Sequence, residues 1–408
     1  MATSAVHPWD ARVGHGPRVM SAALRSPVAL VVASSAVAAG IAAGWWGYVD
    51  LAVYRFGGQS VLDQQPVYAA AAPGSGLLFT YPPCAALVMT VLAVPPFWVA
   101  AAALTAMGVA ALAATLHAVG RESGAPLGPR ALALVTAGAL VLDPVRETLQ
   151  FGQVNLVLMA LVAVDLLVLR GRSTGVLIGV AASIKLTPLL LVVFLVLIGR
   201  RAAALRAVSV FAASVLVGVV LLPGDAAAYW GQALWDTDRV GGVEYVRNQS
   251  LLGALTRLGH QQPSTAVWAL VAGAIGLAVL RVAAAWWRRG HRDVGVLLAA
   301  GAVLLCSPIS WDHHWVWAAP LLLVLWRRAP RWVAVATAVL VLLGPRALVH
   351  HGDGSELGWD VVQQLPGNGY VWLALLLSGA AGYALRAGSI RPVTSPSVSR
   401  PPSVLGAE

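Results

Sequence analysis

Apolar runs, several of them long enough to cross a membrane, alternate with short polar segments along this chain. The first run covers 27–49, follows Arg12, Arg18 and Arg25, and exceeds the core of a signal peptide, so we expect a retained membrane anchor. A transmembrane helix needs about 20 mostly apolar residues. With shorter runs admitted, further spans are expected at 97–118, 131–142, 153–170, 174–184, 187–199, 207–222, 264–287, 294–308, 313–326, 332–349 and 369–386. The pattern therefore predicts an all-α polytopic membrane protein of about 12 transmembrane helices.

Two segments leave the topology open. Segment 81–95 either crosses the membrane or lies embedded at one face, and 174–199 forms either two short spans or one helix. Cytoplasmic loops carry an excess of Lys and Arg. If 81–95 does not cross, 20 of the 27 basic residues fall on the side of the N-terminus, which gives 12 spans with both termini cytoplasmic. We prefer this arrangement, although the opposite assignment of both segments also gives 12 spans.

The composition agrees with a lipid environment. Of the 408 residues, 59% are hydrophobic and only 11% are charged, and the mean hydropathy is +0.77. A soluble domain carries about 25% charged residues, so a soluble enzyme and a disordered chain are both excluded. The net charge of +10 is spread over small clusters between apolar runs, so no nucleic-acid partner is expected. Cys84 and Cys306 lack metal-like spacing and are expected to be inert thiols.

The two ends of the chain differ from its centre. Residues 1–26 and 388–408 are rich in Ser, Pro and Arg and are expected to be flexible cytoplasmic ends. They flank a single transmembrane domain over 27–387. We therefore expect a multi-pass protein of the plasma membrane, in contact with membrane lipids.

Polar and aromatic residues gather on the face opposite the termini. In the preferred topology the inward loops are short and basic. The outward loops are longer and chemically richer, and they cover 50–80, 143–152, the turn around Lys185, 223–262, 307–314 and 350–368. A simple helical bundle does not need these residues, so we expect function at the outer interface.

Asp50 ends the first predicted span, at a depth where a carboxylate is costly to desolvate. Partial burial would raise its pKa toward that of a useful base. The alternative is an ordinary helix-end Asp in interfacial water. Tyr54 and Arg55 follow about one helical turn later, and both could reach the same pocket if the chain continues as a surface helix.

Lys185 is the only lysine, and it precedes a Thr-Pro that interrupts an apolar segment. An ammonium at a broken helix can bind an anion. Snorkelling to water is the alternative, but the arginine used elsewhere in the chain would serve that equally well. His313 and His314, after Trp311 and Asp312, could titrate, donate hydrogen bonds or bind metal. Adjacent histidines on a helix point about 100° apart, so we expect at most one in a given pocket, and no metal site.

Two further segments offer groups that bind sugar or phosphate. Segment 143–155, DPVRETLQFGQVN, contains Arg146, Gln153 and Asn155, which suit sugar hydroxyls or phosphate and could equally cap helices. The loop 223–262 combines aromatic residues with Arg247 and Asn248. Such aromatics belong either to a membrane-interface belt or to a sugar-stacking cleft. Residues 248–250 also match a glycosylation acceptor, but a three-residue match is weak. No Gly-rich nucleotide loop follows a strand, so nucleotide chemistry has no support.

The order of these motifs resembles a known family. DLAVYR opens at Asp50, FTYPP covers 79–83, and DPVRETLQFGQVN, ASIKLTP and SPISWDHHW follow. This sequence is similar, over about 27–385, to the actinobacterial polyprenyl-phosphomannose-dependent mannosyltransferases of the GT-C type. Within them it most resembles the α-1,2-mannosyltransferases that elongate phosphatidylinositol mannosides. Related mannosyltransferases that branch lipomannan share the pattern.

The resemblance implies an inverting glycosyltransferase with its active site on the outer, periplasmic side of the plasma membrane. The donor would be polyprenyl-phosphate-mannose, a co-substrate rather than a cofactor, and the acceptor a phosphatidylinositol mannoside. It implies that Asp50 is the catalytic base, that Lys185 binds the donor phosphate, and that His314 lies near that phosphate. It also implies that the segment containing Tyr81 is an embedded juxtamembrane helix.

The remaining candidates take supporting roles in this reading. Tyr54, Arg55, Tyr81 and His313 would bind the donor, and Trp311 would join the possible acceptor-binding residues named above. A lipid or sugar transporter is the main rival function. It would require charges deep in several spans, whereas Asp165 is the exception here, and the polar residues collect on one face, which favours an enzyme. A membrane scaffold would not explain the settings of Asp50 and Lys185.

Overall fold

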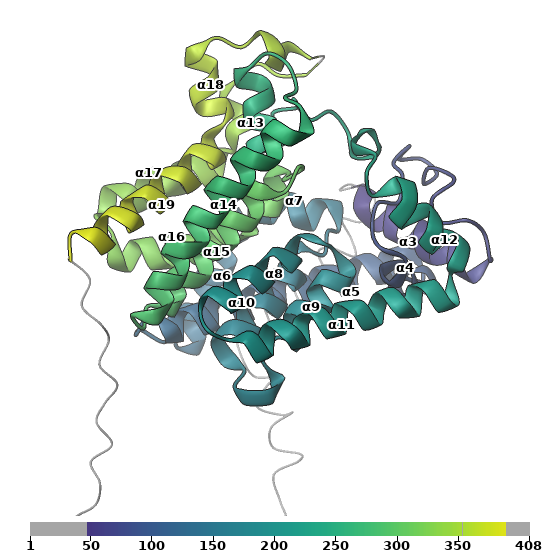
Figure 1. Cartoon of the computed structure of the whole chain (residues 1–408), viewed down its shortest axis with the longest axis horizontal. Helices are drawn as coiled ribbons and strands as arrows, with labels where there is room; N and C mark the ends of the chain where they lie inside the picture. The colour runs from purple at the N-terminus through teal and green to yellow at the C-terminus, as the bar shows by residue number, and fades with distance from the viewer. Residues whose placement is uncertain (1–46, 353, 389–408) are drawn as a thin grey trace, which may run out of the picture.

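The computed structural model describes residues 47–352 and 354–388. For residues 237 and 238 it describes the backbone only. The first predicted span lies almost wholly outside the described residues, as do the predicted N-terminal segment 1–26 and nearly all of the predicted tail. The described chain is all-α, as the sequence predicts, and its only extended pairings are two isolated β-bridges. Figure 1 shows the helices packed as one body.

The first group of helices surrounds the larger hydrophobic core. Apolar side chains recur along each helix, and their burial against neighbours outweighs the weak helix propensity of Val and Ile. The group comprises α3 (Val49–Leu62), α4 (Pro83–Ala93), α5 (Phe97–Glu122), α8 (Asn155–Ala163), the π-helical turn η1 (Val164–Val168), α9 (Val176–Ile184), α10 (Leu191–Leu197) and α11 (Arg201–Leu221). Helices α3 and α4 pack on each other, as do α9 and α11, and α5 and α8.

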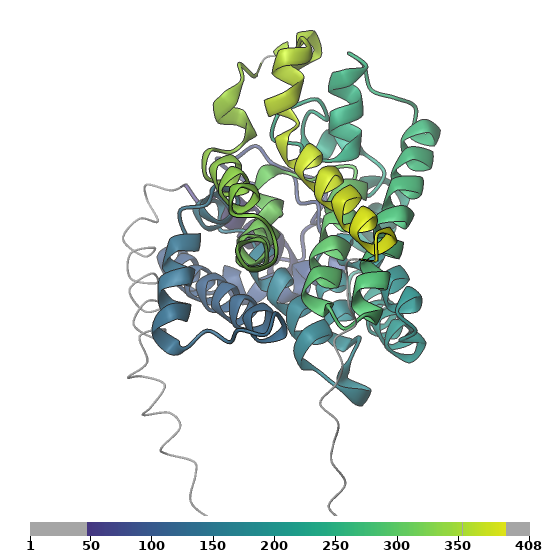
Figure 2. The same cartoon turned by 90° about the vertical axis from the view of Figure 1, so that its left-hand side faces the viewer.

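The second group forms a smaller core with α5 and α8. It comprises α6 (Pro129–Ala139), α7 (Asp143–Phe151), α13 (Leu251–Leu258), α14 (Thr265–Arg288), α15 (Arg292–Cys306), α16 (Ala318–Arg328), α17 (Arg331–Leu343) and α19 (Gly369–Arg386). Helices α14 and α15 pack along each other and connect the two cores. Helices α13 and α18 (Val361–Gly367) stand at one end of the molecule, at the top of both views (Figures 1 and 2).

Short helical turns complete the chain between these helices. They are η2 (Gly171–Ser173), η3 (Thr187–Leu190), α12 (Pro223–Ala228), η4 (Tyr229–Ala233), η5 (Thr237–Val240), η6 (Asp312–Trp317), η7 (Pro345–Leu348) and η8 (Ser355–Gly358). Several of them, including η3, η6 and η8, overlap the predicted outward loops, whereas η7 lies within the predicted span 332–349.

The described helices only partly reproduce the predicted spans. Three of them, α5, α11 and α14, are long and apolar enough to cross a membrane, and a fourth span results if α7 and α8 with η1, bent by 119°, count as one. Most of the other predicted spans contain shorter helices, such as α17 within 332–349, whereas α19 covers the whole of the predicted span 369–386. Several apolar helices therefore support an integral membrane protein, while the count of 12 stays a prediction.

The two ambiguous segments have definite shapes. Segment 81–95 forms the 11-residue helix α4, which rises about 16 Å, roughly half the thickness of a bilayer core, so it is too short to cross. Segment 174–199 is not one helix, because the chain becomes extended at Lys185 before the Pro-containing turn η3.

Asp165, the one acid predicted within a span, has a structural role. Its carboxylate is fully buried and accepts hydrogen bonds from the backbone N–H groups of Gly175, Leu177 and Ile178. These donors belong to the first turn of α9, which has no earlier carbonyl partners. The carboxylate therefore caps α9 and fixes it against η1.

Candidate functional site

A cavity of about 1,200 Å³ lies between α3, the junction of α7 and α8, the break at Lys185 and the segments 229–247 and 303–314. Eight of the thirteen predicted site residues line it: Asp50, Tyr81, Gln153, Lys185, Arg247, Trp311, His313 and His314. The other five, Tyr54, Arg55, Arg146, Asn155 and Asn248, lie outside its lining. Residues separated by up to 264 positions thus share one space.

Asp50 is placed by a sharp entry into α3. The chain turns through the positive-φ residues Gly47 and Tyr48, and Asp50 then lies in the first helical turn. Gly152, at the bend after α7, makes room for this turn. A Cβ atom at Gly152 would lie 2.8 Å from both Leu51 and Tyr48 side-chain atoms. The glycine therefore allows the α7–α8 bend to bring Gln153 next to Asp50.

The environment of Asp50 suits a base. Burial raises the pKa of this carboxyl, and electrostatic interactions with His313 and Lys185 and a hydrogen bond with Gln153 act in the opposite direction. The Oε1 atom of Gln153 accepts from the Tyr54 hydroxyl at 2.6 Å and lies 3.3 Å from the Tyr81 hydroxyl. The amide N–H groups of Gln153 are therefore left for Asp50, and an amide that donates stabilises the ionised carboxylate.

Tyr54 lies behind the cavity wall instead of in it. Its ring is fully buried, and its hydroxyl lies 2.9 Å from that of Tyr81. The expected direct contact with substrate is thus replaced by a contact that orients Gln153 and Tyr81. Of the pair, Tyr81 alone reaches the cavity.

Lys185 projects from the break between α9 and η3. Its Nζ atom donates to Asn155 Oδ1 at 3.2 Å and contacts His314 Nε2 at 2.9 Å. Because an ammonium has only donors, His314 Nε2 must accept, and the ring proton of His314 must be on Nδ1. Burial lowers the pKa of Lys185 to about 8, against the attraction of Asp50. The Lys185 ammonium is therefore held in one orientation by neutral neighbours, which leaves its positive charge available to an anion.

Both histidines line the cavity, so the expectation of at most one was wrong. The segment is a 3₁₀ helix, η6, and the two rings stand edge to face with centroids 4.8 Å apart. The backbone carbonyl of His313 accepts from Thr148 Oγ1 at 2.7 Å and from Asn155 Nδ2 at 3.1 Å. Asn155 thus positions Lys185 and His313 from outside the main cavity.

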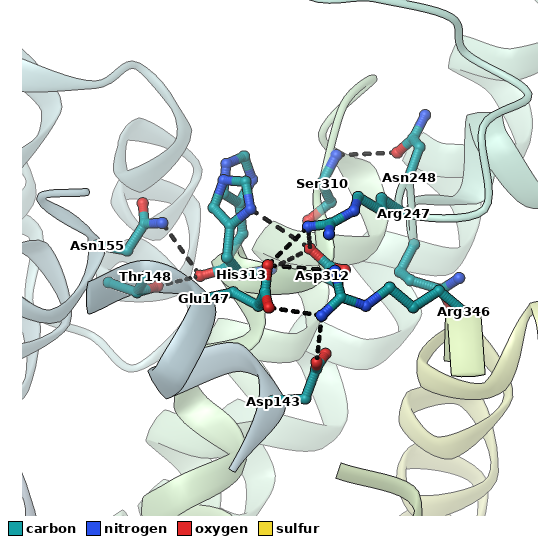
Figure 3. Close-up of polar contacts among 12 residues, drawn as sticks. Asp143, Glu147, Thr148, Asn155, Arg247, Asn248, Ser310, Asp312, His313 and Arg346 are labelled. Atoms are coloured by element: carbon teal, nitrogen blue, oxygen red, sulfur yellow. Dashed lines mark hydrogen bonds and ion pairs between the residues drawn. The ribbon is translucent and has the colours of Figure 1, made fainter. Parts of the chain in front are cut away.

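An ion-pair network fills the wall beside His313 (Figure 3). Arg247 Nη1 lies 2.9 Å from Glu147 Oε2 and 3.4 Å from Asp312 Oδ1. Arg346 lies 2.5 Å from Glu147 and 3.2 Å from Asp143. These four contacts join α7, η6, η7 and the segment before α13. We use the term ion-pair network for Asp143, Arg146, Glu147, Arg247, Asp312 and Arg346.

Sequence reasoning missed most of this network. Glu147, Asp312 and Arg346 were not candidates, although Glu147 lies between Arg146 and Gln153 in a segment that was singled out. The available signal was a pair of acids, Asp143 and Glu147, four positions apart. Such a pair lies on one face of a helix and repels unless cations from elsewhere approach it.

Arg55 and Arg146 make their contacts outside the cavity. Arg55 is five positions after Asp50 and therefore about 140° around α3 from it. Its guanidinium donates to the carbonyls of Leu92 and of Pro95, the latter at 2.6 Å, and so caps the end of α4. Arg146, the most exposed member of the ion-pair network, pairs with Asp143 at 2.8 Å.

Asn248 is fully buried and serves the fold. Its amide donates to Val243 and Pro308 carbonyls and accepts from the Ser310 N–H at 3.0 Å. These bonds place the loop of Arg247 beside the loop of Trp311. A glycosylation site needs an accessible Asn, which this one is not.

No group of three or more His, Cys, Asp or Glu side chains gathers as a metal site within 47–388, as far as these residues are described. Charged side chains of both signs line the cavity instead: Asp50, Lys185, Asp236, Arg239, Glu244, Arg247 and Glu356. This arrangement offers a carboxylate that can take a proton and cations that can hold a leaving anion.

Comparison with known proteins points to glycosyl transfer. The family model of glycosyltransferase family 87 matches residues 79–308. A Mycobacterium tuberculosis H37Rv protein, a polyprenol-phosphate-mannose-dependent α-(1-2)-phosphatidylinositol mannoside mannosyltransferase, is 33% identical over 83% of this chain and 85% of its own length. A Mycolicibacterium smegmatis protein of the same name is 33% identical over 80% of this chain and 81% of its own length.

A second type of relative acts on a pentamannoside. A polyprenol-phosphate-mannose-dependent α-(1-2)-phosphatidylinositol pentamannoside mannosyltransferase from M. tuberculosis CDC 1551 is 38% identical over 68% of this chain and 65% of its own length. No solved structure matches the chain. The family model covers more than half of the sequence, and the chain is thus a glycosyltransferase that belongs to glycosyltransferase family 87.

Proposed function

We propose that this protein transfers mannose from polyprenol-phosphate-mannose to a phosphatidylinositol mannoside and forms an α-1,2 linkage. The observation that carries the proposal is the meeting of Asp50, Lys185 and His314 in one cavity. The names of the mycobacterial relatives supply the donor, acceptor and linkage. A carboxylate that can act as a base, close to a cation, suits transfer of a sugar from a phosphate ester.

In this mechanism Asp50 is the general base of a single displacement. The acceptor hydroxyl oxygen attacks C1 of mannose and loses its proton to Asp50, while the bond from C1 to the phosphate oxygen breaks. The lipid phosphate leaves as an anion, so no general acid is required. A single displacement inverts the configuration, which converts a β-linked donor into an α-linked product.

The cations stabilise the leaving phosphate. Two N–H groups of the Lys185 ammonium contact Asn155 and His314, and its remaining N–H group can donate to the leaving phosphate. His314, with its ring proton on Nδ1, is a neutral donor at the same place, and Arg247 supplies a further charge on the wall. Such preorganised donors are worth a few kcal/mol each in a site that excludes water. We therefore expect no strict requirement for a divalent metal.

We place the reaction on the outer side of the plasma membrane, with both termini cytoplasmic and residues 27–387 as one catalytic domain. The charge distribution supports this orientation, because only 7 of the 27 basic residues fall on the outer side in the preferred topology. Lys185 and Arg247 are two of the seven. Their presence on the sparsely charged side is consistent with a role in binding.

One assay tests the donor, the acceptor and the reaction class. The purified protein in liposomes is given radiolabelled polyprenol-phosphate-mannose with a phosphatidylinositol tetramannoside, a pentamannoside or a lipomannan fragment, with and without EDTA. We expect EDTA-resistant transfer to a phosphatidylinositol mannoside, and linkage analysis should give an α-1,2 bond. Asp50→Asn protein is the control. Transfer to lipomannan alone, or movement of the donor across the bilayer without transfer, would contradict the proposal.

A further inference from the structure

A second cavity of about 980 Å³ lies beside the main one, and the proposed chemistry does not use it. Its walls come from the segment 61–69, from Leu87 of α4 and from the segment 221–239. Ala233 and Arg239 line both cavities, so the two spaces meet at these side chains. The volume is at the upper end of the range for small-molecule sites, which is large enough for a lipid headgroup.

Specific bonds hold the walls of this second cavity. Asp225 Oδ1 accepts from the backbone N–H of Val67 at 2.8 Å, and Arg239 Nη2 donates to the carbonyl of Tyr68 at 2.9 Å. The rings of Tyr68 and Tyr229 pack with centroids 5.4 Å apart. The segment 225–239 is therefore fastened at both ends to the loop that follows α3, and the space between them is a fixed feature of the fold.

The lining of the second cavity combines two kinds of side chain. Its polar members are Gln64, Gln65, Asp225, Gln232 and Arg239, and its apolar members include Leu87, Leu221 and Leu222. Amides and carboxylates bind sugar or inositol hydroxyls, whereas leucines do not. The cavity therefore suits a ligand that is itself polar at one end and apolar at the other.

The helices that carry these leucines also present apolar side chains at the surface. Helices α4 and α11 pack closely, since a Cβ atom at Gly218 would lie 3.2 Å from Pro83. Val91 of α4 is 72% exposed and Val220 of α11 is 66% exposed. In a membrane protein such faces contact lipid. Acyl chains can thus leave the cavity directly into the bilayer.

Arg239 gives the second cavity a site for an anion. Its Nε atom is buried and has no hydrogen-bond partner in the part of the chain that is described. No carboxylate forms an ion pair with its guanidinium, among the side chains that the structure describes. A guanidinium with unused donors is well suited to a phosphate, which it can bind through two parallel hydrogen bonds.

We propose that the second cavity binds the phosphoinositol head of the acceptor, with the phosphate on Arg239. The acyl chains leave over the exposed apolar side chains of α4 and α11, and the mannose chain passes Ala233 into the main cavity and reaches Asp50. The inference rests on the proposed function, because it names how that acceptor binds. The donor uses a different cation, Lys185, so the two phosphates of the reaction have separate sites.

Two acceptor substrates distinguish binding of the phosphoinositol head from other roles of Arg239. One is a phosphatidylinositol mannoside, and the other is octyl α-mannoside, which has a mannose but no phosphate. For Arg239→Gln we expect at least a tenfold rise in KM for the phosphoinositol acceptor. We expect an unchanged KM for the donor and unchanged turnover of octyl α-mannoside. Arg239→Lys should recover part of the loss, because it restores the charge but not the paired hydrogen bonds.

A matched control is Arg206→Gln. Arg206 also donates to backbone carbonyls, of Thr174 and Gly171, but it lines neither cavity. It should leave both acceptors unaffected. Gln232→Trp adds bulk to the lining of the second cavity at a residue that takes no part in the hydrogen bond between Arg239 and Tyr68, and it should reproduce the selective loss.

The outcomes are distinguishable. An unchanged KM for the phosphoinositol acceptor in Arg239→Gln would overturn the inference, and so would equal losses with both acceptors, which indicate a structural role for Arg239. If wild-type protein uses neither acceptor, the proposed function itself fails. Selective loss in both Arg239→Gln and Gln232→Trp would support the second cavity as the acceptor site.

Discussion

Two charged regions meet at the same cavity, which Arg247 lines for one of them, and they differ in how their charges are balanced. The ion-pair network holds three carboxylates and three guanidinium groups in mutual contact. The reaction cluster, Asp50, Gln153, Lys185 and His314, holds one carboxylate and one ammonium, with neutral groups between them. Partners offset part of the cost of burying ions in the network, where burial still raises the pKa of Asp143 to about 7. The reaction cluster has fewer charged partners to offset that cost, which shifts the pKa of Asp50 and Lys185 and leaves both groups available to a substrate.

The comparison predicts opposite consequences of mutation. Changes in the reaction cluster should lower the rate and leave stability unchanged, whereas changes in the ion-pair network should lower stability first. The following variants separate these effects, and activity is measured with the assay described above.

Asp50→Asn should have the largest effect on rate. It removes the base but keeps the shape, so kcat should fall by about a hundred- to ten-thousandfold. The melting temperature should stay the same or rise, because a costly buried carboxylate is replaced by a neutral amide. Thermal unfolding in detergent, beside the transfer assay, gives both values. A variant that keeps near-normal turnover would refute Asp50 as the base.

Glu147→Ala should have the largest effect on stability. Its loss leaves Arg247 and Arg346 partly unpaired in a buried site, which costs about 3–5 kcal/mol. We expect a fall of several degrees in the melting temperature, together with weaker substrate binding because Arg247 is no longer held against the wall. Glu147→Gln, which keeps hydrogen bonding, should lose less. An unchanged melting temperature in Glu147→Ala would remove the distinction between the two regions.

The pH dependence of kcat/KM tests the reaction cluster without disrupting the fold. Asp50 must be ionised, so the rate should fall as the pH drops through its pKa, which burial raises above the usual 3.8. Lys185 must be protonated, so the rate should fall as the pH rises through about 8. Lys185→Arg keeps its charge at all these pH values and should lose the alkaline limb. If the limb persists in that variant, another group causes it.

Lys185→Met should lower kcat/KM for the donor by about tenfold to a hundredfold, because one charged hydrogen bond to the donor phosphate is lost. This change removes positive charge from the reaction cluster only. The melting temperature should therefore remain close to that of the wild type. A large fall in stability would place Lys185 with the structural cations.

Arg55→Ala should have the smallest effect. Arg55 caps α4 and does not reach the cavity, so kcat/KM should change by less than about threefold and stability by about 1 kcal/mol. A transfer assay over a range of donor concentrations checks this. A large rise in donor KM would return Arg55 to the donor site that the sequence suggested.

The sequence indicated the reactive residues better than their supports. Asp50 and Lys185 were recognisable because each is a charged residue at the end of an apolar run. Tyr54 and Arg55 were assigned to the pocket together, although residues four and five positions after Asp50 differ by about 100° around a helix. Asn155 and Asn248 were recognised as polar residues of interest, but their roles depend on carbonyls of His313, Val243 and Pro308, which no local pattern reveals.

The sequence by itself determined that the chain is helical and suited to lipid, because a bilayer admits only apolar side chains and backbone groups that are bonded internally. It also determined which ionisable groups stand out from that background. Tertiary structure alone decided which of them meet. Lys185 and His314 are 129 positions apart and Arg247 and Glu147 are 100 apart. Contacts at such separations depend on how helices pack and bend, which is set by side-chain volumes on several elements at once.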